Sequence, residues 1–186
     1  MNPVSHVHDL IDRLGFTQQG LLNIAELTYY PEIRDICATD QCRCYGKSWS
    51  CPPAVGTLEE CRQRIESYDT MILFSLKTEL EDSFDYEGMM EGAAAFKDLV
   101  GELQTQLPEL LTAEAANPNP RYLLMALAGC KRCGTCTYPD APCRYPESMF
   151  HSLEGYGFDV HLLAEAAGIK YNNGPNTVTY FGAILI

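Results

Sequence analysis

Residues 70–77 read TMILFSLK, a run of bulky apolar side chains that is typical of a buried β-strand. Two other segments share this character, residues 122–128 and the final stretch 177–186, which reads TVTYFGAILI. Three such strands predict a small β-sheet at the centre of the fold.

Helical patterns surround these strands. Apolar residues recur with a helical period over residues 4–14 and, most clearly, over 89–107, where Pro108 is expected to interrupt or end the helix. Residues 57–60 read TLEE, a capping box that predicts a helix running to about residue 67. Shorter helices are expected over these ranges: 31–36, 147–155 and 159–168. Together the elements predict an α+β fold, with helices packed on a small mixed sheet.

The composition limits the classes of protein to consider. The chain has 186 residues, of which 46% are hydrophobic, which is enough to build the core of a single domain spanning residues 1–186. The net charge of −12 argues against binding to nucleic acid or to an anionic membrane, and it indicates either a partner with a basic docking face or simply a surface that keeps the chain soluble. No apolar stretch is long enough to span a bilayer, and no export signal is recognised. We therefore expect a soluble protein of the reducing cytoplasm.

Nine cysteines are the most unusual feature of the composition. In a reducing compartment, closely spaced cysteines indicate metal ligands or redox thiols. They gather in two cysteine-rich loops, at residues 37–61 and 130–143.

The later loop reads CKRCGTCTYPDAPC. A C-x2-C-x2-C run lets three consecutive thiolates reach one iron–sulfur cluster from a tight loop, and a further cysteine supplies the fourth. Zinc also takes four thiolates, but usually from two well-separated C-x2-C pairs, so zinc at one or both sites remains the alternative. The predicted ligands of this loop are Cys130, Cys133, Cys136 and Cys143.

The earlier loop is less regular, and its cysteines are Cys37, Cys42, Cys44, Cys51 and Cys61. Cys42 and Cys44 are separated by a single residue, an awkward spacing for two ligands of one cluster, so one of the pair is a candidate bystander. Cys61 is either a buried core thiol or a ligand near the start of a helix. If the fourth ligand position stays unfilled, one iron is left open to solvent or substrate.

The string CATDQCRCYGKSWSCPPAVGTLEEC, the later GCKRCGTCTYPDAPCRYPES and the ending NTVTYFGAILI resemble a cysteine-rich family of predicted metal-binding proteins, domain of unknown function 2284. The resemblance covers nearly the whole chain. It implies one ligand set of Cys37, Cys42, Cys51 and Cys61 and a second of Cys130, Cys133, Cys136 and Cys143. It makes Cys44 the spare or alternative ligand. The family is commonly met in anaerobic microbes.

These observations predict an iron–sulfur protein with two [4Fe–4S]-type clusters that transfers electrons to or from a partner enzyme in anaerobic metabolism. An electron carrier is favoured over an enzyme, and self-association is left open. One alternative is an enzyme or activating factor with an open or unusual iron–sulfur site. The other is a zinc-binding structural or metal-trafficking protein.

Overall fold

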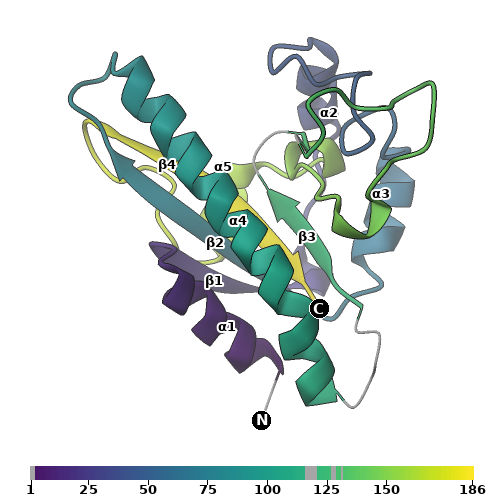
Figure 1. Cartoon of the computed structure of the whole chain (residues 1–186), viewed down its shortest axis with the longest axis horizontal. Helices are drawn as coiled ribbons and strands as arrows, with labels where there is room; N and C mark the ends of the chain where they lie inside the picture. The colour runs from purple at the N-terminus through teal and green to yellow at the C-terminus, as the bar shows by residue number, and fades with distance from the viewer. Residues whose placement is uncertain (1–2, 116–120, 127–128, 131) are drawn as a thin grey trace.

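The computed structural model describes residues 3–115, 121–126, 129–130 and 132–186, and its strands form one antiparallel sheet (Figure 1). The strands are β1 (Gln18–Asn23), β2 (Thr70–Glu79), β3 (Leu123–Ala126) and β4 (Thr177–Leu185). Their order is β1-β2-β4-β3, so the C-terminal strand lies between β2 and β3. The predicted α+β class is confirmed, although the named strands all pair antiparallel and not as a mixed sheet.

The helices cover both faces of this sheet. They are α1 (Pro3–Leu14), α2 (Pro31–Ala38), α3 (Leu58–Ile65), α4 (Tyr86–Ala115) and α5 (Val160–Ala166), with 3-10 turns η1 (Ile24–Glu26), η2 (Pro146–Ser148) and η3 (Glu154–Tyr156). Figure 1 shows the long helix α4 crossing one face of the sheet, with α1 alongside. None of the helices in the described part of the chain is both long and apolar enough to cross a membrane.

Strand β2 is apolar at consecutive positions because both of its faces are buried. Ile72 and Phe74 pack in the core layer formed with α1 and α4. Met71 and Leu73 point the other way, into a second layer that includes Ile65 of α3 and residues of η3 and α5. The second layer supports the end of the molecule where the cysteines lie.

Several sequence predictions are confirmed. The strands expected at residues 70–77 and 177–186 are β2 and β4, and the capping box of Thr57 and Glu60 starts α3. The strand expected at 122–128 is β3, which spans Leu123–Ala126. Positions 127 and 128 of the expected range lie outside the described residues.

Two predictions about elements are wrong, and one strand was missed. Helix α4 continues through Pro108 to Ala115, because buried Leu107 and Leu111 hold it against the core on both sides of the proline. The helix expected at 147–155 is replaced by the turns η2 and η3. Strand β1 was not predicted, since it is a partly exposed strand in which only Leu22 is buried.

His151 lies between these two turns and ties them to the sheet. Its backbone N–H donates to Leu124 O (3.2 Å), and its carbonyl accepts from Ala126 N (2.9 Å). Its ring packs edge-on against Tyr156, and its buried Nδ1 has no hydrogen-bond partner among the described residues. Burial, helped by the charge of Arg64, lowers the pKa of His151 to about 4.

This histidine should make stability depend on pH. Between the unfolded pKa of 6.5 and the folded value of about 4, the unfolded chain binds a proton that the folded chain does not. The contribution of His151 to the free energy of unfolding is therefore lost as the pH falls through this window. Urea denaturation of the His151→Gln variant at several pH values should show a weaker loss of stability on acidification than the wild type. His161→Gln, at an exposed position, is the control and should keep the wild-type slope; equal slopes for His151→Gln and wild type would contradict the assignment.

Candidate metal centre

The two cysteine-rich segments lie together beside α2 and α3 (Figure 1). The earlier segment connects α2 to α3, and the later one follows β3. Helix α2 places Cys37 in its last turn, and Pro31 at its first turn supplies a backbone angle suited to helix initiation. Strand β3 at the edge of the sheet thus places the later cysteine-rich segment next to the earlier one.

Ser50 joins the two segments. Its side chain is fully buried, and its Oγ accepts a hydrogen bond from the backbone N–H of Cys130 at 2.6 Å, which we call the Ser50 contact. The same oxygen lies 2.9 Å from Ser48 Oγ and 3.9 Å from Cys51 Sγ. A single hydroxyl therefore touches a residue of each predicted ligand set. Sequence reasoning missed Ser50, because nothing local distinguishes it from any other loop serine.

Other contacts reinforce this joint. The indole N–H of Trp49 donates to Ala141 O at 3.0 Å, and its ring meets Tyr138 edge-on with 4.9 Å between centroids. Ser152 N donates to Ser50 O at 3.4 Å. The two cysteine-rich segments thus form one packed unit.

The four cysteines of the later loop line a single pocket, the later pocket. The other lining residues are Ser48, Trp49, Arg132, Tyr145 and Met149. Its volume is about 20 Å³, roughly the space of one water molecule. The four predicted ligands are thus brought together, but binding a group larger than a single ion requires the loop to open.

Hydrogen-bond donors surround Cys136. Burial alone would raise its pKa, but the backbone N–H groups of Tyr138 and Trp49, together with the Ser48 hydroxyl, outweigh burial and lower the pKa of Cys136. Such donors stabilise a thiolate, the form in which cysteine binds metal. The earlier segment therefore supplies donors to a sulfur of the later one.

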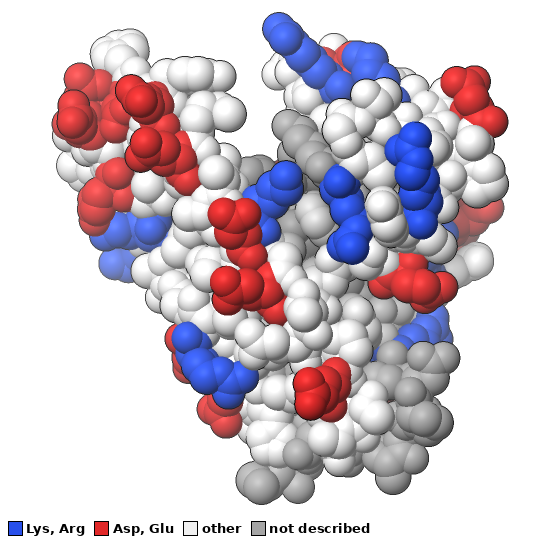
Figure 2. All heavy atoms as spheres, in the orientation of Figure 1, with Lys and Arg blue, Asp and Glu red and all other residues white. Residues whose placement is uncertain are grey.

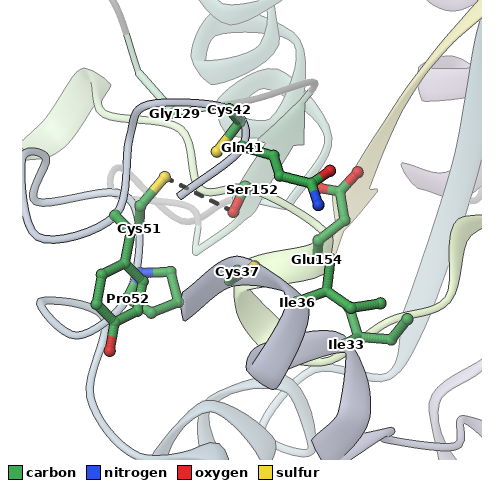
Figure 3. Close-up of a pocket in the computed structure, with 11 residues that line it drawn as sticks. Ile33, Ile36, Cys37, Gln41, Cys42, Cys51, Pro52, Gly129, Ser152 and Glu154 are labelled. Atoms are coloured by element: carbon green, nitrogen blue, oxygen red, sulfur yellow. Dashed lines mark hydrogen bonds between the residues drawn. The ribbon is translucent and has the colours of Figure 1, made fainter. Parts of the chain in front are cut away.

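Three cysteines of the earlier loop line a second and larger pocket, the earlier pocket, of about 300 Å³ (Figure 3). They are Cys37, Cys42 and Cys51. The remaining wall is partly apolar and partly polar, and consists of Ile33, Ile36, Gln41, Tyr45, Pro52, Gly129, Ser152 and Glu154.

The thiols of the earlier pocket are held in an environment that disfavours negative charge. Burial raises the pKa of Cys51 to about 12, although hydrogen bonds with Ser50 and Ser152 act in the opposite direction. Burial also raises the pKa values of Cys37 and Cys42. A bound metal would supply the positive charge that these thiolates need.

Cys61 is not among the described residues that line the earlier pocket. It is fully buried in α3, where its Sγ lies 3.5 Å from Val55 O and 3.6 Å from Arg34 Nη1. Its role as a ligand stays a prediction, since this arrangement directs the sulfur toward core groups.

Cys44 lines neither pocket among the described residues. Its thiol donates to Cys42 O at 3.4 Å, and its role as the spare or alternative ligand stays a prediction.

Gly129 fits the later segment against the earlier pocket. A Cβ at this position would lie 2.8 Å from Cys51 Sγ and 3.3 Å from Ser50 Oγ. Only a residue without a side chain allows the two segments to approach this closely.

Within the described part of the chain, no three His, Cys, Asp or Glu side chains are arranged to hold one metal ion. The cysteines instead border spaces, the larger of which accommodates several atoms.

Comparison with known proteins gives one match. A family model described as "Predicted metal-binding protein (DUF2284)" matches residues 20–186. No curated protein and no solved structure matches the chain.

The close approach at Gly129 generates a stability prediction. Gly129→Ala should lower the free energy of unfolding by about 1–3 kcal/mol, because the new methyl group overlaps Cys51 Sγ. Gly134→Ala is the matched control, since a Cβ there meets nothing within 4 Å, and it should change stability by less than about 0.5 kcal/mol. Urea denaturation of both variants measures the difference. Equal stabilities would show that the two segments are not packed as described.

Proposed function

Because the chain belongs to the DUF2284 family of predicted metal-binding proteins, we propose that it is an iron–sulfur protein that binds clusters at two adjoining cysteine sites and transfers electrons to or from a partner protein. The observation that carries the proposal is the later pocket, in which four cysteines from one loop line a common space that would widen around a cluster. Bound there, a cluster supplies the capacity to accept and release single electrons.

The donor set fits this chemistry. The described residues lining the later pocket include four thiols but no carboxylate and no histidine. The C-x2-C-x2-C spacing is typical of iron–sulfur ligation, and hydrogen bonds to sulfur, such as those at Cys136, help to set cluster potentials. Cys130, Cys133, Cys136 and Cys143 would hold this cluster.

The contact between the segments supports electron exchange between two sites. Gly129 lines the earlier pocket, and the next residue, Cys130, lines the later one. The Ser50 contact fixes this junction. Clusters bound in the two pockets would be separated only by this junction. Electrons would then pass between them without an intermediate carrier.

The charge distribution supports docking of the partner at the cysteine end. The acidic segment 79–87 lies at the opposite end of β2, where Figure 2 shows acidic side chains gathered. By sequence, the cysteine segments hold equal numbers of basic and acidic residues: Arg43, Lys47, Lys131 and Arg132 against Asp40, Glu59, Glu60 and Asp140. These segments are therefore close to neutral, and a partner docking there needs no basic face.

A second candidate function is an enzyme or activating factor with an open iron site. It is favoured by the earlier pocket, where three cysteines line a space of about 300 Å³ and Cys61 lies elsewhere. An iron without a fourth thiolate can bind a small ligand. Zinc binding, as a structural or trafficking protein, is the third candidate.

Metal analysis tests the proposal. Protein purified without oxygen should contain about four iron and four sulfide ions per cysteine set and little zinc. Its reduced form should give the electron paramagnetic resonance spectrum of iron–sulfur clusters. Stoichiometric zinc without iron or sulfide would overturn the proposal.

Single substitutions assign the later site. Cys136→Ser should remove about half of the bound iron, because it deletes one of four thiolates of one cluster. Cys44→Ser is the matched control, since Cys44 lines neither described pocket, and it should retain the wild-type iron content. If Cys44→Ser loses iron while Cys136→Ser does not, the ligand assignment is wrong.

A further inference from the structure

Glu154 is a carboxylate on the wall of the earlier pocket that the predicted ligand sets do not use (Figure 3). It begins the turn η3, and Figure 3 shows it together with Cys42 and Cys51 around the same space. Among the described residues it forms no ion pair. Burial raises the pKa of Glu154, while a hydrogen bond from its own backbone N–H acts in the opposite direction.

The nearby cation, Arg34, does not compensate this carboxylate. Its guanidinium donates to Gly155 O at 2.9 Å through Nη1 and to Gly56 O at 2.8 Å through Nη2. Nη1 also lies 3.6 Å from Cys61 Sγ. The donors of Arg34 thus point to the η3 backbone and to Cys61, leaving Glu154 available to another cation.

The turn that presents Glu154 is rigidly packed. Ser152 Oγ accepts from Gly155 N at 3.0 Å and lies 3.9 Å from Cys51 Sγ. A Cβ at Gly155 would collide with Ser152 Oγ and would lie 3.2 Å from Pro52 Cδ. The turn therefore packs tightly against the Cys51-Pro52 segment. This packing places the Glu154 carboxylate and the Cys51 thiol on the wall of the same pocket.

Glu154 is half-buried and lines the same pocket as the three thiols. The earlier pocket offers three thiols, which leave one iron of a four-iron cluster without a protein ligand. Carboxylate oxygens are established ligands of protein-bound iron. We propose that the Glu154 carboxylate is the fourth ligand of the earlier site and binds the iron that its three cysteines leave open. This inference rests on the proposed iron–sulfur function.

The proposal makes the earlier site different from the later one. A carboxylate is a harder and more readily displaced ligand than a thiolate, so the iron on Glu154 is the one that a small molecule entering the pocket can reach. The later cluster, with four thiolates, is confined to electron transfer. Cys61 then remains a core thiol, hydrogen-bonded near Val55 and Arg34.

Substitutions at Glu154 test this ligand through cluster composition, independently of any activity. The wild type, Glu154→Ala, Glu154→Gln and Glu154→Cys proteins are reconstituted anaerobically with ferrous iron and sulfide, then titrated with ferricyanide. Glu154→Ala and Glu154→Gln should lose about one of the four irons of the earlier cluster and show the signal of the oxidised three-iron cluster at the first additions of ferricyanide, which takes up the electron released with the iron. The wild type should keep this iron until more ferricyanide has been added, and Glu154→Cys should retain it longest.

Glu147→Gln is the matched control, because this exposed glutamate lines neither described pocket, and it should behave as the wild type. The signal of the later cluster, unchanged in all variants, reports that each variant is folded. Identical iron contents and spectra for the wild type and all Glu154 variants would overturn the inference while leaving the proposed function intact. Loss of the iron in Cys61→Ala instead would assign the fourth ligand to Cys61. A wild-type protein that takes up no iron and sulfide would overturn the proposed function and this inference together.

Discussion

The candidate centre depends on one buried hydroxyl. Ser50 Oγ, on a fully buried side chain, accepts the backbone N–H of Cys130. Such a hydrogen bond contributes about 0.5–1.5 kcal/mol, so this contact favours one relative position of two loops that are far apart in the chain. The same position brings Gly129 against Cys51. Two sets of cysteines become one unit through these contacts.

The scaffold explains why the unit forms at this end of the sheet. Strand β3 delivers the later loop at its C-terminal end, while α2 and the capped helix α3 hold the two ends of the earlier loop. Both helices are held in place by contacts with the rest of the fold. Ile65 of α3 is buried in the core, and Arg34 of α2 donates a hydrogen bond to η3. The regular elements thus position the loops, and the loops contain the cysteines.

Sequence patterns predicted what is local in this protein. The four cysteines of the later pocket come from one short loop, so their spacing alone predicted that they share a space. The apolar runs of β2 and β4 predicted these strands equally well, because both faces of the strands are buried. Strand β1 was not, since a partly exposed strand with one buried leucine has no clear pattern.

Contacts between distant segments could not be predicted in this way. Ser50 meets Cys130, and Glu154 shares a pocket with Cys37, only because the fold brings separate loops together. For the same reason, spacing could not show that Cys61 faces the core.

If the two cysteine sites adjoin, clusters bound in them lie close together, and the electron paramagnetic resonance spectrum of the fully reduced protein tests this most directly. We predict signals split or broadened by coupling between two neighbouring clusters, compared with Cys136→Ser and Cys51→Ser proteins that each lack one; a spectrum equal to the sum of those two variants would contradict the account.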